Sequence, residues 1–191
     1  MTDPADERFM RKALREGRKG LGRTSPNPAV GAVIVRDQKV IAAGYHRKAG
    51  GPHAEIEALS RLEGPCVQGD TLYVTLEPCN HTGRTPPCTE AILKSGLSRV
   101  VVGTEDPNPR VAGGGCAYLK GSGVEVVTGV LERESKELIE AFAKHSMTGR
   151  PFVTAKSAST LDGWTATKYG HSRWVTNESS RGFVHRLRDR T

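Results

Sequence analysis

The sequence contains no continuous apolar run of about 18 residues, the length that a membrane-spanning helix requires. Its first residues, Met1–Arg8, are polar and acidic and lack the apolar segment of a secretory signal. Only four of the 191 residues are cysteines, and in a chain of this kind metal binding or simple burial is a better explanation than a disulfide framework. We therefore expect a cytoplasmic protein with no membrane partner.

Aromatic residues make up only 5% of the chain, and no basic stripe interleaved with aromatics occurs. This argues against a nucleic-acid partner, although the net charge is +7. The excess positive charge either serves solubility or attracts a small phosphorylated molecule. The sequence does not reveal the oligomeric state and leaves a homodimer or homotetramer open.

Strand and helix patterns alternate along most of the chain. The patterns predict strands at 29–35, 40–43, 71–76, 99–103 and 124–127, and helices at 5–19, 54–62, 89–94, 117–120 and 131–144. In the first helix Phe9, Ala13 and Leu14 are expected to be buried. Such alternation is typical of an α/β sheet covered by helices on both faces.

A boundary is predicted at Gly149-Arg150-Pro151, which divides the chain into domains 1–148 and 149–191. Beyond it a strand at 152–156 and a helix starting near Asn177, a suitable N-cap, are expected. About forty residues are too few for an independent core. The second segment therefore resembles the front edge of a larger domain.

Two segments carry a zinc-ligand pattern, Gly51-Pro-His-Ala-Glu-Ile56 and Glu77–Cys88. A catalytic zinc takes three protein ligands and keeps a position for water, and His53, Cys79 and Cys88 supply that number. Glu55 follows His53 by two residues and is expected to carry protons between water, ring nitrogen and leaving ammonia. Zinc deaminases share this division of labour, with the signature H-x-E…P-C-x-x-C.

The spacing of the cysteines departs from that signature, because eight residues rather than two separate Cys79 from Cys88. The tight spacing is typical of nucleoside, tRNA-adenosine and polynucleotide deaminases. The longer insert adds His81 and Arg84 to the expected pocket wall, which suits a polar or phosphorylated substrate. Two alternatives stay open, a nucleobase or tRNA-adenosine deaminase and a non-catalytic binding module whose structural zinc has His81 as fourth ligand.

The chain resembles the bifunctional deaminase–reductases of riboflavin biosynthesis at several further motifs. They are Pro26–Val35, Gly44–His46, Gly51–Glu55, Glu77–Cys88, Asp106–Pro109, Leu161–Gly163, Ser172–Thr176 and His185–Arg188. The resemblance implies a three-layer α/β/α cytidine-deaminase-like domain with a mixed five-stranded sheet and one Zn²⁺, followed by a fragment of an α/β reductase domain. It also implies deamination of 2,5-diamino-6-ribosylamino-4(3H)-pyrimidinone 5′-phosphate.

The resemblance assigns site residues as well. Those expected to line the substrate pocket are Asn27, His46, His81, Arg84, Asp106 and Asn108. In the reductase-like segment Ala158 and Trp174 match cofactor positions for NADPH, and Ser172 and Arg188 match substrate positions. Trp164 stands where the family usually has a basic residue. Because the rest of a nucleotide-binding body is not in the sequence, no reductase activity is expected from these 191 residues.

Overall fold

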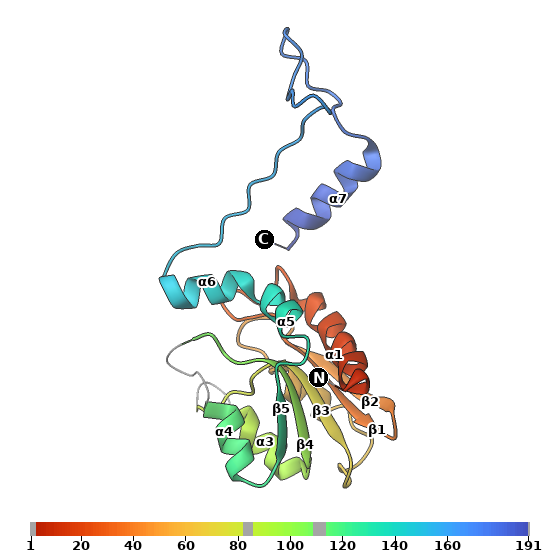
Figure 1. Cartoon of the computed structure of the whole chain (residues 1–191), viewed down its shortest axis with the longest axis vertical. Coiled ribbons are helices and arrows are strands. Elements are labelled where there is room, and N and C mark those ends of the chain that lie inside the picture. Colours follow the sequence, from red (N-terminus) through yellow and green to blue (C-terminus); the bar gives the residue numbers. More distant parts are fainter. Residues whose placement is uncertain (1–2, 82–85, 109–113, 191) are drawn as a thin grey trace. The chain divides into compact units, whose positions relative to one another are not determined.

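The computed structural model describes residues 3–81, 86–108 and 114–190 (Figure 1). The chain forms two units, Met1–Phe152 and Val153–Thr191. Among the described residues, none of the helices has both the length and the apolar character that a membrane span requires.

The first unit is built on a five-stranded mixed sheet. Its strands are β1 (Gly31–Arg36), β2 (Lys39–Tyr45), β3 (Thr71–Leu76), β4 (Arg99–Thr104) and β5 (Glu125–Thr128). Their order is β2-β1-β3-β4-β5, with β1 antiparallel to both β2 and β3 and with β3, β4 and β5 parallel. The sheet confirms the mixed five-stranded prediction and places the carboxyl ends of β3 and β4 at the same edge.

Helices cover both faces of this sheet. They are α1 (Pro4–Gly17), the 3₁₀ turn η1 (Arg18–Gly20), α2 (Ala54–Leu59), α3 (Cys88–Ser95), α4 (Gly114–Gly121), α5 (Glu132–Leu138) and α6 (Glu140–Thr148). Helix α1 contacts β1, β3 and α5, whereas α2 contacts β1, β2 and α3. Successive residues of β1, Val33 and Ile34, are both buried. Since neighbouring side chains point to opposite faces, both faces of the strand are covered.

The apolar side of α1 packs on the sheet as its sequence predicts. Phe9, Ala13 and Leu14 are buried, and the Phe9 ring lies 5.3 Å from that of Tyr73 on β3. Asp6 is buried on the same helix, where it accepts hydrogen bonds from Tyr73 and Arg99. This polar cluster fixes the helix to the centre of the sheet.

The single helix predicted at 131–144 is wrong. Helix α5 ends at Leu138 and α6 begins at Glu140, because Ile139 leaves helical geometry with φ −111° and ψ 15°. Leu138 and Ile139 are both buried, whereas α6 has no buried residue. Burial of this consecutive apolar pair therefore replaces the continuous helix.

The second unit contains one helix, α7 (Glu178–Arg188), within its described residues. Asn177 caps it as predicted, accepting a hydrogen bond from the Ser180 N–H at 2.8 Å. The strand predicted at 152–156 is wrong, since this stretch has no regular structure. A strand needs a neighbouring strand to satisfy its backbone, and the described part of this unit offers none.

Candidate metal centre and active site

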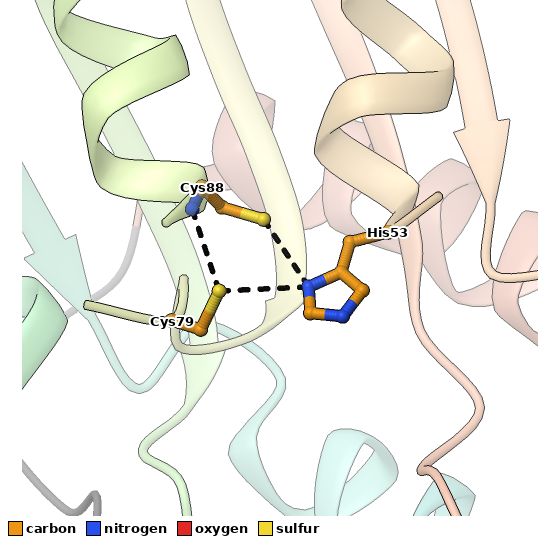
Figure 2. A group of neighbouring side chains, drawn as sticks. All are labelled: His53, Cys79 and Cys88. Atoms are coloured by element: carbon orange, nitrogen blue, oxygen red, sulfur yellow. Dashed lines mark hydrogen bonds between the residues drawn. The ribbon is translucent and has the colours of Figure 1, made fainter. Parts of the chain in front are cut away.

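The three predicted zinc ligands lie together at the start of two helices. His53 is the residue before α2, Cys88 is the first residue of α3, and Cys79 lies in the loop after β3. Their ligand atoms all lie within 4.8 Å of one another. His53 Nδ1 is 3.5 Å from Cys79 Sγ and 3.2 Å from Cys88 Sγ (Figure 2). Residues far apart in sequence thus converge on one point.

The spacing of these atoms fits zinc. Zn–S bonds of about 2.3 Å and Zn–N bonds of about 2.0–2.1 Å at tetrahedral angles place sulfur and nitrogen about 3.6 Å apart. The two nitrogen–sulfur distances are close to that value. His81, the fourth ligand considered above, is exposed and does not belong to the group that the described residues form. His53, Cys79 and Cys88 therefore offer the three ligands of a zinc centre.

The charges of the two thiols are linked. The hydrogen bond from Cys88 lowers the pKa of Cys79 to about 4, and the same bond raises the pKa of Cys88. The hydrogen bond with Cys79 also raises the pKa of His53. Cys79 therefore loses its proton easily, whereas Cys88 keeps its proton. A second thiolate would be a negative charge buried beside the first. A divalent cation between the sulfurs offsets that repulsion, so the electrostatics also fit a metal.

Glu55 lies beside the ligands and is 3% exposed. Burial raises its pKa to about 7, and its carboxyl group hydrogen-bonds with Cys88. A carboxyl group whose pKa lies near neutral pH can both accept and release a proton under ordinary conditions. Glu55 lies on the first turn of α2, two residues after the ligand His53.

Asn27 and His46 are hydrogen-bonded to each other. Asn27 Nδ2 lies 3.1 Å from His46 Nε2, and His46 Nδ1 lies 2.9 Å from the carbonyl oxygen of Pro52. Because that carbonyl only accepts, the imidazole proton is on Nδ1 and Nε2 accepts from the Asn27 amide. Burial lowers the pKa of His46, which keeps the ring neutral. The amide oxygen of Asn27 therefore faces away from His46.

The loop after β4 brings a further carboxylate toward the metal ligands. Asp106 Oδ1 accepts a hydrogen bond from the Asn108 N–H at 2.8 Å. Burial raises the pKa of Asp106, and the charges of Glu77, His81 and Cys79 also act on it. Asp106 is thus close enough to Cys79 for the two charges to interact, and Asn108 is hydrogen-bonded to Asp106. Arg84 lies outside the described residues.

Sequence reasoning assigned no role to Glu77, which is 5% exposed. Its Oε2 accepts from the Asp106 N–H at 3.1 Å and its Oε1 accepts from the Cys116 N–H at 2.9 Å. The only sequence signal was a charged residue directly after a strand that contains no charged residue. Cys116 is buried beside it.

The four residues assigned to the reductase-like segment all lie in the second unit. Ser172, Trp174 and Arg188 are exposed, and Ala158 is partly exposed. The guanidinium of Arg181 lies 4.2 Å from the centre of the Trp174 ring, a cation–π contact.

Comparison with known families agrees with the zinc cluster. Residues 3–104 match the cytidine and deoxycytidylate deaminase zinc-binding region. The chain belongs to this deaminase family. Residues 151–191 match the RibD C-terminal domain. The resemblance to riboflavin-biosynthesis deaminase–reductases is therefore confirmed at both ends of the chain.

Individual relatives support the same assignment. The riboflavin biosynthesis protein RibD of Aquifex aeolicus is 51% identical over 98% of this chain, which covers 52% of that protein. RibD of Escherichia coli is 45% identical over 96% of this chain, which covers 50% of that protein. The chain spans about half the length of the curated relatives it matches.

Solved structures share the fold. The deaminase/reductase of Thermotoga maritima is 49% identical to this chain and superposes with a TM-score of 0.91. The match covers 96% of this chain and 53% of the Thermotoga chain. RibD of Acinetobacter baumannii is 48% identical with a TM-score of 0.86, and the match covers 97% of this chain and 52% of the Acinetobacter chain. The cytidine-deaminase-like fold predicted from the sequence is thereby confirmed.

Proposed function

We propose that this chain hydrolyses the 2-amino group of 2,5-diamino-6-ribosylamino-4(3H)-pyrimidinone 5′-phosphate in riboflavin biosynthesis. Oxygen replaces the amino group, ammonia leaves, and 5-amino-6-ribosylaminouracil 5′-phosphate is the product. The observation that carries the proposal is the convergence of His53, Cys79, Cys88 and Glu55, in a chain about half identical to RibD proteins over nearly its whole length.

Glu55 is the proton carrier in this proposal. Zinc, held by the three ligands, would supply the Lewis acidity that lowers the pKa of a water molecule. The Glu55 carboxylate accepts one proton from the attacking water and delivers it to the ring nitrogen. It then accepts the remaining proton of the added hydroxyl group as the carbonyl forms and delivers that proton to the departing amine, which leaves as ammonia. Its burial excludes bulk water from that carboxyl group, so its protons pass to the substrate.

The pocket residues orient the ring and its phosphorylated ribose. The amide oxygen of Asn27 is available to accept from a ring amino group, because its Nδ2 is bound to His46. In this proposal Asp106 and Asn108 bind ribose or ring amines, and His81 and Arg84, the latter outside the described residues, bind the anionic part of the substrate. These assignments follow the resemblance, and the burial of His46 favours an action through Asn27.

Domain assignment follows the same proposal. Residues 1–148 form the deaminase and residues 149–191 begin the reductase, as the division at Phe152 and the family match from residue 151 support. NADPH binding through Ala158 and Trp174 belongs to a complete reductase domain, as does substrate binding through Ser172 and Arg188.

The test is Glu55→Gln, assayed by ammonia release and by the mass change of NH replaced by O in the nucleotide. We expect activity to fall by about 10²–10⁴-fold, the usual contribution of a general acid–base group, with zinc content unchanged. Glu57→Gln is the matched control, since Glu57 lies on the same helix and pairs with Arg47 and Arg61 at the surface.

Full activity in Glu55→Gln would contradict the mechanism. If the protein deaminated a free nucleobase or tRNA adenosine but not the pyrimidinone nucleotide, the proposed substrate would be wrong. Zinc bound by four protein ligands without any turnover would instead support a binding module.

A further inference from the structure

Two buried carboxylates flank the central strand β3. Asp70 precedes its first residue and Glu77 follows its last, with exposed fractions of 0% and 5%. Asp70 is neutralised by Arg36, whose nitrogens lie 2.7 and 2.8 Å from its oxygens, and it accepts from the Val67 N–H. In contrast, both oxygens of Glu77 accept from backbone N–H groups. Glu77 therefore organises main chain at the end of β3 that carries Cys79.

The two N–H groups that Glu77 binds belong to different parts of the site. Asp106 lies in the loop after β4, and Cys116 lies in the first turn of α4. The Glu77 N–H in turn donates to the Thr104 carbonyl at 2.9 Å, which ties β3 to the end of β4. Glu77 thus connects the end of β3 with the loop after β4 and with the start of α4. The metal ligand Cys79 is only two residues away in the sequence.

Close packing makes this junction rigid. A side chain on Gly115 would collide with the carbonyl oxygen of Pro78 and approach Cγ of Glu77 to 3.3 Å, so α4 abuts the Glu77–Cys79 backbone. Asn80 also donates to the Gly114 carbonyl at 3.4 Å and accepts from Thr89 Oγ1 at 2.8 Å. The start of α4, the start of α3 and the Cys79 loop are therefore held at fixed separations.

We propose that Glu77 is a positioning residue that sets the 105–108 loop against the zinc-ligand segment and thereby determines how Asp106 and Asn108 meet the substrate. The proposal rests on the proposed function for its effect on the nucleotide, but not for the hydrogen bonds themselves. Glu77 touches no reacting atom in this scheme. Its influence passes through the Asp106 N–H.

Replacement by glutamine isolates this role. The side-chain amide introduced by Glu77→Gln keeps one acceptor oxygen but presents an NH₂ group to the second backbone N–H, and two donors cannot bond. One of the two segments must therefore shift or lose its partner. Glu77→Asp keeps both acceptor oxygens on a shorter side chain and serves as the conservative variant.

The kinetic experiment compares Glu77→Gln with Asp70→Asn, the carboxylate at the opposite end of β3. If the 105–108 loop binds substrate equally in ground and transition states, its displacement raises KM and leaves kcat nearly unchanged. We expect KM for the pyrimidine nucleotide to rise about tenfold in Glu77→Gln, as for loss of about 1.4 kcal/mol of binding. The zinc content of Glu77→Gln should stay at the wild-type value, and Asp70→Asn should leave KM unchanged. KM of Glu77→Asp should lie between those of the wild type and Glu77→Gln.

Amide hydrogen exchange tests the same inference without any activity. In the wild-type protein the Asp106 amide should exchange slowly although it lies in a loop, and in Glu77→Gln the Asp106 or Cys116 amide should exchange faster. The wild-type measurement applies even if the variant fails to fold. If the protein shows no deaminase activity while the exchange pattern holds, the proposed function fails and the positioning role stands.

Fast exchange of the wild-type Asp106 amide would overturn the inference. So would an unchanged KM with unchanged exchange in Glu77→Gln, or an equal rise of KM in Asp70→Asn. Loss of zinc from Glu77→Gln would also overturn it, because Glu77 would then support the metal ligands rather than the loop.

Discussion

Asp6→Asn should destabilise the first unit through one buried ionic cluster. Asp6 accepts a hydrogen bond from Tyr73 Oη at 2.9 Å and two from the Arg99 guanidinium at 2.8 and 2.9 Å. Removing one partner of a buried ion pair costs about 3–5 kcal/mol, because the other charge remains buried. Arg99 is 24% exposed and keeps a 2.9 Å contact with Glu125. We therefore expect a loss of about 2–3 kcal/mol, below that range because Arg99 is partly solvated.

Urea unfolding followed by far-ultraviolet circular dichroism measures this difference. Both tryptophans, Trp164 and Trp174, lie in the second unit and would not report on this core. Glu16→Gln is the matched control, since Glu16 lies on the same helix and pairs with the exposed Lys19, a contact expected to contribute below about 1 kcal/mol. If Asp6→Asn costs no more than Glu16→Gln, the account of the buried cluster is refuted.

Three other outcomes follow from the structure. The Arg99 hydrogen bonds hold the pKa of Asp6 below its usual value. The stabilisation that they give is therefore complete above about pH 4 and is lost as the pH falls through the folded-state pKa. In urea titrations at acid pH, the difference in unfolding free energy between wild type and Asp6→Asn should become smaller. Gly31→Ala should lower the free energy of unfolding by about 1–3 kcal/mol in the same assay, because its Cβ would collide with Ala13 O and the Gly17 backbone. Removal of metal by a chelator should lower the thermal midpoint of the first unit, and Zn²⁺ but not Mg²⁺ should restore it in a calorimetric scan, since thiolate and imidazole ligands favour zinc.

The sheet and the metal ligands could be predicted from the sequence because local pattern determines both. Apolar β-branched runs such as that of β4 have few alternatives to a buried strand. His53 and Cys88 each stand directly before or at the start of a helix, and the H-x-E and P-C patterns mark those starts. Ligand type and helix start together identify the cluster without knowledge of the sheet order.

Features that depend on tertiary contacts could not be predicted in this way. The break at Ile139 arises because two consecutive apolar residues are buried, whereas the helical pattern across 131–144 is continuous in sequence. The run at 152–156 has strand-forming residues, but it has no partner strand within the described part of its unit. Propensity indicates what a segment favours, and only its neighbours decide the outcome.

The polar residues show the same limit. Asn27 and His46 appear in the sequence as two separate ligand-binding side chains, yet in the structure they bind each other and the Pro52 carbonyl. Glu77 has no distinctive spacing, yet it accepts hydrogen bonds from two distant segments. The residue type determines which hydrogen bonds a side chain can form. Its surroundings in the folded protein determine whether the partner is another part of the protein or the substrate.

The eight-residue gap between the cysteines can be interpreted in the same terms. The Cys88 N–H donates to Cys79 Sγ at 3.3 Å, and the Thr89 N–H donates to the Cys79 carbonyl at 3.3 Å. These bonds join the two ends of the insert, so the two ligand sulfurs meet although eight residues separate the cysteines. In the function proposed above, residues of this insert bind the substrate. On that proposal, the cysteine spacing bears on the choice of substrate rather than on the metal.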